Sequence, residues 1–284
     1  MVYSISNTGL TAIINSKGAE LISLKSNLTG NEYIWNGNPG FWAKHSPILF
    51  PIVGTLKNGF YNHENQQYHL SRHGFARDIE FELISKSANE AVFSLKSSEE
   101  TLHLYPFDFE LQLIYTLNES ELKIEYSVIN TGSKDMYYSI GGHPALALPN
   151  RFEDYSLLFE PGEDLLSHQL ENDLLSDTSF QIKLESGRLP LTYSLFEKDA
   201  LIFKELKSCK IQLLENDKPI LDFKFNSFPN FGIWTKIGAP FICLEPWAGY
   251  SDVVNASGKL NEKEGIQTLG ANASKRHSFS FEIL

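Results

Sequence analysis

The chain has 284 residues, and 35 acidic side chains against 24 basic ones give it a formal charge of −11. A negative charge repels phosphate backbones and anionic lipid headgroups, so we expect neither nucleic acid nor a membrane as a partner. Apolar residues make up 42% of the chain and aromatic residues 13%, which is enough to form a folded core rather than a disordered chain.

The cysteine content and the N-terminal residues indicate a cytoplasmic protein. Two cysteines are too few for a disulfide framework or a thiolate metal cage. The first residues show no basic segment followed by an apolar run of the kind that marks a secretory signal. No apolar stretch approaches the roughly 18 residues of a membrane span.

Apolar and polar residues alternate along much of the chain, as expected for β-strands with one buried face. In chain order, the clearest runs are Ile79–Leu83, Phe109–Leu117, Leu122–Val128, Leu221–Phe225 and Phe279–Ile283. Asn, Gly and Pro residues separate such runs at short intervals. Helical spacing is never sustained over three turns, and the best helix candidates, Asp164–Leu175 and Asn261–Glu264, are short. The pattern predicts an all-β fold, a large antiparallel β-sandwich with few short helices.

The length alone is compatible with about two domains. No linker, low-complexity tract or repeat divides the sequence, so we expect residues 1–284 to form a single β-sandwich domain. A domain of this size can bury about three quarters of its unfolded surface.

Three segments break the alternation and combine ionisable residues with glycine or proline. They are Ser71–Arg77, Ser139–Ala145 and Cys243–Gly249. In the second, paired glycines and Pro144 would hold His143 on a stiff loop at the end of a strand. The alternative is a buried histidine that bonds to a carbonyl group.

In the third segment an apolar run leads directly to Glu245, where a carboxylate is costly unless it is paired or functional. Trp247 beside it would suit stacking on the apolar face of a sugar ring. The alternatives are a glutamate that points to solvent and a tryptophan that belongs to the core.

The first segment places His73 between Arg72 and Arg77. Arginine recognises carboxylates, phosphates or neighbouring hydroxyl groups through paired donors. The alternative is a surface turn with two cations.

Other chemistries have little support. The chain has no nucleophile elbow, no P-loop and no dinucleotide fingerprint. His63, His69 and His73 lack a cysteine or carboxylate at zinc-like spacing, so we predict no metal. Glu245 and Asp252 could form the carboxylate pair of a glycosidase, and their spacing in sequence does not fix their distance.

Taken together, the segments resemble the aldose 1-epimerase (galactose mutarotase) superfamily, in particular its LacX-like branch, which has hexose-6-phosphate mutarotases as neighbours. The resemblance extends from about residue 20 to the end. The matching motifs are Phe41–Gly54, His73–Arg77, Gly141–Pro144, Phe196–Leu201 and Leu244–Trp247.

This resemblance implies an isomerase that interconverts the α and β anomers of an aldohexose, in carbohydrate and specifically galactose metabolism, without cofactor or metal. His143 would be the general acid, Glu245 the general base, and His73 a second histidine near the ring oxygen. The substrate-binding residues would be Arg72, Arg77, Asp199, Lys44 and Trp247. A hexose-6-phosphate mutarotase and a non-catalytic sugar-binding protein on the same fold are the alternatives. The sequence leaves open which sugar binds, whether it is phosphorylated, and the oligomeric state.

Overall fold

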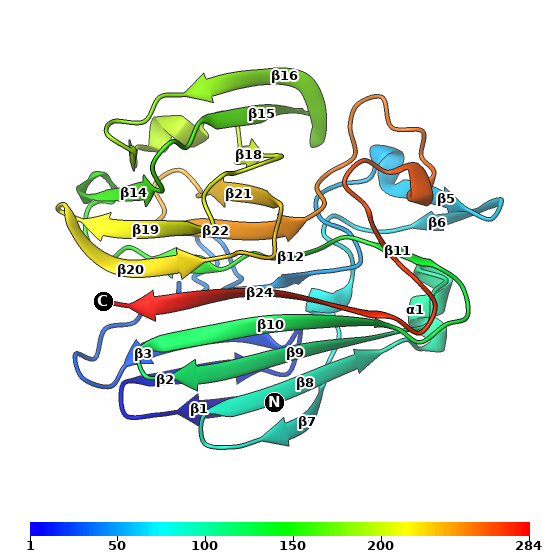
Figure 1. The fold of residues 1–284 in the computed structure, drawn as a ribbon, viewed down its shortest axis with the longest axis horizontal. Helices are drawn as coiled ribbons and strands as arrows, with labels where there is room; N and C mark the ends of the chain where they lie inside the picture. Colours follow the sequence, from blue (N-terminus) through cyan, green and yellow to red (C-terminus); the bar gives the residue numbers. More distant parts are fainter.

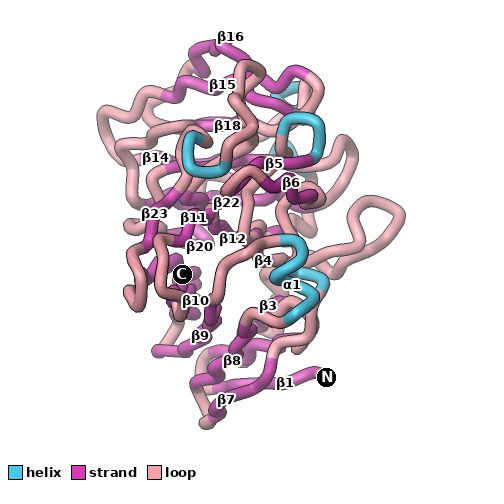
Figure 2. Tube along the Cα trace, turned by 90° about the vertical axis from the view of Figure 1, so that its right-hand side faces the viewer, coloured by secondary structure: helices cyan, strands magenta, loops and turns pink.

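Two large antiparallel sheets form the body of the molecule. The computed structural model describes residues 1–284, with one nine-stranded sheet, one eight-stranded sheet and three small sheets (Figure 1). A view turned by 90° shows that strands and loops dominate and that the helices are a few short turns (Figure 2). The predicted all-β antiparallel architecture is confirmed.

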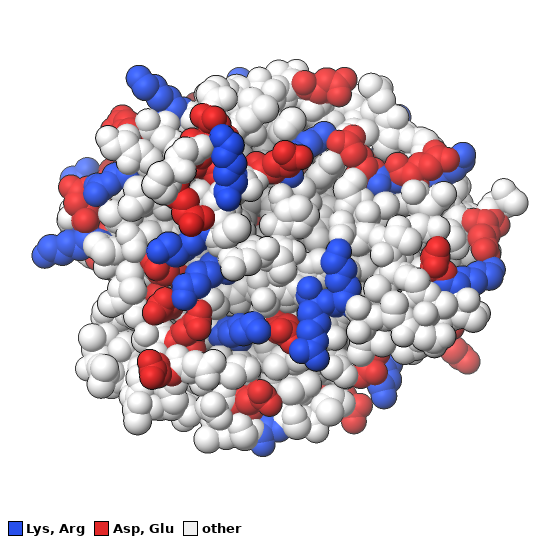
Figure 3. Space-filling view, in the orientation of Figure 1, with Lys and Arg blue, Asp and Glu red and all other residues white.

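The nine-stranded sheet holds most of the strands that the alternating pattern predicts. Its order is β17 (Arg188–Pro190), β14 (Tyr155–Phe159), β19 (Lys210–Glu215), β20 (Lys218–Lys224), β24 (Ser274–Ile283), β10 (Glu121–Asn130), β9 (Phe109–Asn118), β8 (Glu90–Lys96) and β7 (Glu82–Lys86). Ion pairs link neighbouring strands of this sheet, such as Arg276 with Glu125 and Lys224 with Glu282. Figure 3 shows acidic and basic side chains interspersed, so this face has no uniform charge.

The eight-stranded sheet has shorter strands drawn from distant parts of the chain. Its order is β16 (Leu174–Ile182), β15 (Leu165–Glu171), β18 (Leu201–Phe203), β21 (Asn230–Trp234), β22 (Phe241–Ala248), β12 (Ile140–Gly142) and β4 (Ile48–Leu49), and β13 (Ala145–Ala147) also pairs with β22. The small sheets are β1 (Val2–Ser6) with β2 (Leu10–Asn15) and β3 (Glu20–Ser26), β5 (Phe60–His63) with β6 (Gln66–His69), and β11 (Met136–Tyr138) with β23 (Gln267–Leu269).

Helices are few and short, as expected. The one α-helix, α1 (Glu99–Leu104), begins at Ser98, whose side chain accepts a bond from the Thr101 N–H in a capping box. The 3₁₀ turns are η1 (Lys57–Gly59), η2 (Ala76–Asp78), η3 (Phe152–Asp154), η4 (Tyr193–Phe196) and η5 (Leu260–Glu262). No helix is long and apolar enough to cross a membrane.

The helix candidate at Asp164–Leu175 is wrong, because this stretch belongs to the β15–β16 hairpin. The turn at Asn172 and Asp173, both with positive φ, favours paired strands. The second candidate, Asn261–Glu264, overlaps the short turn η5.

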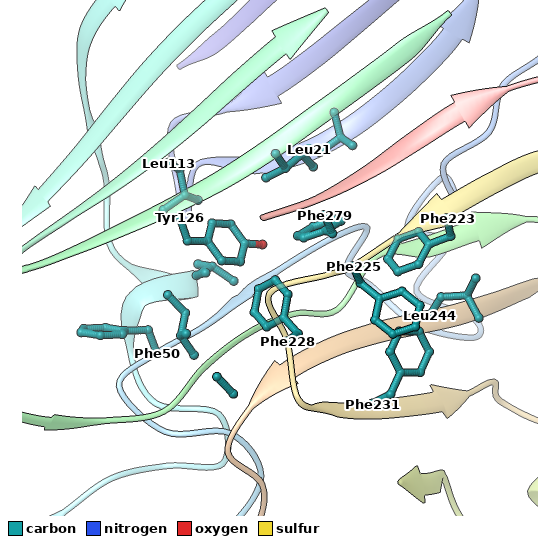
Figure 4. Packing of buried hydrophobic residues seen from close by; sticks show 14 of the residues in the cluster. Leu21, Phe50, Leu113, Tyr126, Phe223, Phe225, Phe228, Phe231, Leu244 and Phe279 are labelled. Carbon is teal, nitrogen blue, oxygen red and sulfur yellow. The ribbon is translucent and has the colours of Figure 1, made fainter. Parts of the chain in front are cut away.

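The core lies between the two large sheets and is rich in aromatic rings (Figure 4). Phe223 and Phe279 come from the nine-stranded sheet, and Phe231 comes from the other sheet. The ring of Phe223 lies 6.0 Å from that of Phe231 and 5.6 Å from that of Phe279, measured between centroids. These contacts leave the other face of the eight-stranded sheet free to carry a site.

Strand β22 is buried on both of its faces. Ile242, Leu244 and Ala248 belong to the core between the sheets. Because successive side chains of a strand alternate, Cys243, Glu245 and Trp247 lie on the opposite face. A polar glutamate is therefore held in the middle of a strand whose side chains are buried on both faces.

We predict that Phe223→Ala will lower the free energy of unfolding by about 3–5 kcal/mol, because it leaves a cavity between the sheets. Phe180→Ala is the control, since that ring is 38% exposed and its loss should cost less than about 1 kcal/mol. Denaturant unfolding measures both. Equal losses in the two variants would contradict this location of the core.

Candidate active site

A cavity of about 650 Å³ opens on the outer face of the eight-stranded sheet and is lined by 17 residues. This volume is in the range typical of small-ligand sites. Seven of the eight residues that the sequence singled out line it, namely His73, His143, Glu245, Arg72, Arg77, Asp199 and Trp247. Lys44 does not line the cavity, since its ammonium group lies 3.2 Å from Asp78 in an ion pair.

His143 and Glu245 meet because they occupy opposite positions on neighbouring strands. Gly141 pairs with Trp247 in β12–β22, and Ala145 pairs with Cys243 in β13–β22. His143 lies midway between these two pairs and therefore faces Glu245, as residues directly opposite in an antiparallel pair do. The His143 Nε2 atom lies 3.2 Å from Glu245 Oε2.

Two glycines bring this strand close to its neighbours. A Cβ atom on Gly141 would lie 2.5 Å from the Trp247 ring, and one on Gly142 would lie 2.9 Å from the Phe279 ring. Gly232 of β21 faces Trp247 from the other side, where an added Cβ atom would lie 2.5 Å from ring atom Cζ2. The indole of Trp247 therefore fits between two strands only because both carry glycine at these positions.

The His73 ring is fixed by a reciprocal pair of bonds with Gly54. The His73 N–H donates to the Gly54 carbonyl at 2.8 Å, and the Gly54 N–H donates to His73 Nδ1 at 3.0 Å. His73 itself has a φ of 68°, a conformation that non-glycine residues adopt rarely and often at functional sites.

The bond from Gly54 determines which nitrogen of His73 carries the proton. Burial lowers the pKa of His73 well below its usual value, and His143, Arg72 and Arg77 add to this effect, so the ring is neutral. A neutral imidazole accepts at one nitrogen only. The Arg72 Nε–H also donates to His73 Nε2 at 3.2 Å, so two donors compete for the ring, and the backbone donor is the more rigid of the two. We therefore assign the proton to Nε2, and in this form the Arg72 Nε–H must turn away from the ring.

Burial opposes the charged form of both members of the His143–Glu245 pair. It lowers the pKa of His143, to about 3, and raises the pKa of Glu245 well above its usual value. Arg72 acts on Glu245 in the opposite direction, because its positive charge favours the carboxylate. The pair as a whole therefore favours one proton and no net charge.

Asp252 is not part of the cavity lining. It is buried in an ion pair with Lys263 at 2.9 Å, and it also accepts the Lys57 N–H. The neighbouring Ser251 hydroxyl accepts the Thr55 N–H. Asp252 thus fixes the loop that carries Gly54, and the geometry does not support the glycosidase pairing of Asp252 with Glu245.

The three spaced histidines do not converge. His63 packs against Phe107, and His69 contacts Gln67, while only His73 reaches the cavity. The group that could hold a metal is instead His143, Cys243 and Glu245, whose ligand atoms lie within 4.8 Å of one another. Burial raises the pKa of the Cys243 thiol well above its usual value, so this group is a poor source of thiolate.

The sequence is similar to known proteins over its whole length. A sequence model of the family described as "Aldose 1-epimerase" matches residues 1–268. The chromosomal LacX protein of Lactococcus lactis subsp. lactis is 34% identical, with 100% of both chains covered. The chain belongs to the aldose 1-epimerase family.

Solved structures agree with this family assignment. A galactose mutarotase related enzyme from Lactobacillus acidophilus is 32% identical, with a TM-score of 0.94 and coverage of 100% of this chain and 97% of that one. A galactose mutarotase-like protein from Lactobacillus casei is also 32% identical, with a TM-score of 0.95 over 100% of both chains. The fold is therefore the galactose mutarotase-like one that the sequence motifs implied.

Several lining residues of this aldose epimerase family member were not singled out from sequence. Among them are Trp42 and Trp234, which surround His143, and Gly54, Lys198 and Ser251. Trp42, Gly54 and Lys198 lie inside the family motifs named above, and this position is the sequence feature that could have identified them as site residues. Trp234 and Ser251 carry no such signal.

We predict that Gly54→Ala will disturb His73. A Cβ atom here would lie 2.7 Å from the Ser251 backbone nitrogen, so the loop must move and the bond to His73 Nδ1 must lengthen. Gly59→Ala is the matched control, because Gly59 has a similar φ of 74° but open space around it. The ¹⁵N shifts of His73 should change in the first variant only. Unchanged shifts in Gly54→Ala would contradict the assigned role of this bond.

Proposed function

We propose that the protein is an aldose 1-epimerase that interconverts the α and β anomers of a neutral aldohexose. The observation that carries this proposal is the contact of His143 with Glu245, 3.2 Å apart, in the wall of a sugar-sized cavity. A protein that only binds sugar has no need for an adjacent acid and base. Family membership supports the same reaction class.

The close contact suits the chemistry of ring opening. The anomeric hydroxyl that loses a proton and the ring oxygen that gains one are attached to the same sugar carbon. An acid and a base that serve them must therefore lie side by side. In the proposed step the Glu245 carboxylate takes the hydroxyl proton while the His143 imidazolium protonates the ring oxygen.

The pair holds one proton before and after this step. Ring opening converts the ionised pair into neutral Glu245 and neutral His143, and the sugar becomes an open aldehyde. Rotation about the C1–C2 bond then presents the other face, and closure reverses both transfers. Because the cycle neither gains nor loses a proton, it needs no proton exchange with water.

His73 supports this reaction as a neutral donor. Its Nε2–H, directed by the Gly54 bond to Nδ1, can donate to the ring oxygen or a neighbouring hydroxyl. Asp199, Arg72 and Arg77 offer further partners for hydroxyl groups, and Trp247 offers an apolar surface beside Glu245.

The ionic contacts of the cavity favour a neutral sugar over a phosphorylated one. Arg72 is paired with Asp173 at 3.1 Å, and Arg77 donates to the Arg72 carbonyl at 2.8 Å. Three acidic residues, Glu197, Asp199 and Glu245, line the cavity beside three basic ones, Arg72, Arg77 and Lys198. A phosphate dianion would have to disrupt these pairs and approach the carboxylates.

We also infer that residues 1–284 act as one domain in the cytoplasm. Site residues come from the first, middle and last parts of the chain and converge on one cavity. Both cysteines, Cys209 and Cys243, are free thiols, which suits a reducing compartment. A role in galactose metabolism follows if galactose proves to be the preferred sugar.

We predict that Glu245→Gln and His143→Asn will each slow anomer exchange by about 10²–10⁴-fold, because each removes one of the two proton transfers. The double variant should lose little more than either single one, since the pair acts as a unit. Polarimetry of freshly dissolved α-glucose or α-galactose measures the rates.

Arg72→Ala provides the comparison, since it should mainly raise KM. A Glu245→Gln variant with a normal rate would exclude the proposed base. Saturable sugar binding by the wild-type protein with no acceleration over buffer would instead support the sugar-binding alternative.

We predict that glucose and galactose will be better substrates than their 6-phosphates, with kcat/KM higher by at least about tenfold for the neutral sugars, because a phosphate would be repelled by the carboxylates that line the cavity. A panel of the four sugars, followed by NMR anomer exchange, measures this. A preference for either 6-phosphate would contradict the neutral-sugar assignment and favour a hexose-6-phosphate mutarotase.

A further inference from the structure

The imidazole of His143 has only one hydrogen-bond partner in the site. Its Nε2 atom contacts Glu245, while its Nδ1 atom is buried without a partner. A ring that is held at one nitrogen can still rotate about that contact. Something other than hydrogen bonding must therefore set the plane of the ring.

Aromatic side chains enclose the ring on several sides. Trp42 stacks on its face, with centroids 4.7 Å apart and planes inclined by 28°. Trp234 contacts it edge-on at 5.8 Å and 79°. Trp42 is in turn packed against Trp234 and Phe241, at 5.7 and 5.8 Å.

Trp42 is held in place from its own loop as well. Its carbonyl accepts the indole N–H of Trp35 at 2.9 Å, and its backbone N–H donates to the Asn38 carbonyl at 3.0 Å. The stacked indole is therefore a fixed wall of the cavity and not a loosely placed side chain.

Charged neighbours make the protonated form of His143 costly. Arg72 and Arg77 oppose it, and burial opposes it more strongly. The other titratable groups near the ring are His73, which is neutral, Cys243, whose thiol is protonated, and Glu245, the one group that favours the imidazolium as a carboxylate. The face of an indole attracts a cation more strongly than any other aromatic side chain.

We propose that Trp42 is a positioning residue that holds the His143 ring in the plane facing Glu245 and stabilises its imidazolium form. This inference rests on the proposed function, because the imidazolium is the acid of the ring-opening step. Trp42 touches the acid through its π-face and acts on the reaction through His143.

The test compares Trp42→Phe and Trp42→Leu with the wild type. We expect kcat to fall by about two- to thirty-fold in Trp42→Leu, the range of a lost cation–π contact, with KM within about twofold. Trp42→Phe should retain more activity than Trp42→Leu, because it keeps an aromatic face. Phe41→Leu is the matched control, since Phe41 contacts Trp35 from the same loop and should leave kcat unchanged.

A second readout does not depend on turnover. A titration of the His143 ¹⁵N shifts from neutral to acidic pH reports how readily the imidazolium forms, and the pH at which it forms should fall in the order wild type, Trp42→Phe, Trp42→Leu. If Trp42→Leu fails to fold, 5-fluorotryptophan weakens the π-face at nearly constant size. Its effect on His143 should be larger in the wild type than in Trp42→Phe, where Trp234 still contacts the ring.

The outcomes separate the two proposals. An unchanged His143 titration, or an imidazolium that forms at higher pH in Trp42→Leu, would overturn the role of Trp42. Equal losses of kcat in Phe41→Leu and Trp42→Leu would do the same, because they would reflect loop disruption. A wild type that does not accelerate anomer exchange would overturn the proposed function and leave the spectroscopic test of Trp42 intact.

Discussion

The contact between His143 and Glu245 is the interaction on which the site depends. Two ionisable groups that each resist their charge in a buried position can share one proton at little cost, because the pair stays neutral. This arrangement keeps a proton available on two buried side chains. It also matches a reaction in which one proton leaves a sugar oxygen and another joins its neighbour.

The architecture explains how a buried pair can exist at all. Strand β22 directs Leu244 into the aromatic core and Glu245 into the cavity, so the same strand contributes to the core and to the site. The core holds the strand rigid, and the register with β12 and β13 places His143 opposite the carboxylate. Pro144 and the two glycines before His143 interrupt regular pairing just where the imidazole must face the cavity.

Sequence alone predicted the sheet architecture and most of the site for different reasons. Alternation in strands such as Phe109–Asn118 and Glu121–Asn130 is a local property, and it identified them directly. Residues such as His143 and Glu245 stood out because they break that pattern. That the two residues face each other across neighbouring strands depends on the register between segments about 100 positions apart. No local sequence pattern encodes that register.

The remaining errors have the same physical origin. Lys44 sits in a matching motif, yet its side chain turns to Asp78, and the choice of partner is a tertiary contact. Trp42 reads as an ordinary core aromatic, although it stacks on His143. The hairpin at Asp164–Leu175 resembled a short helix because Leu166, Leu170 and Leu174 recur at helical spacing and the turn lacks glycine.

The most direct test of the one-proton pair is an NMR titration of protein labelled with ¹⁵N-histidine and ¹³C-glutamate. Together, the Nε2 shift of His143 and the carboxyl shift of Glu245 count the protons on the pair at each pH. We predict that the pair keeps one proton well above the pH at which a free glutamate loses its own, and that both signals change together when the proton is lost. Independent titration, with Glu245 ionised above about pH 4.5 and His143 neutral above about pH 6.5, would contradict the shared proton and the mechanism built on it.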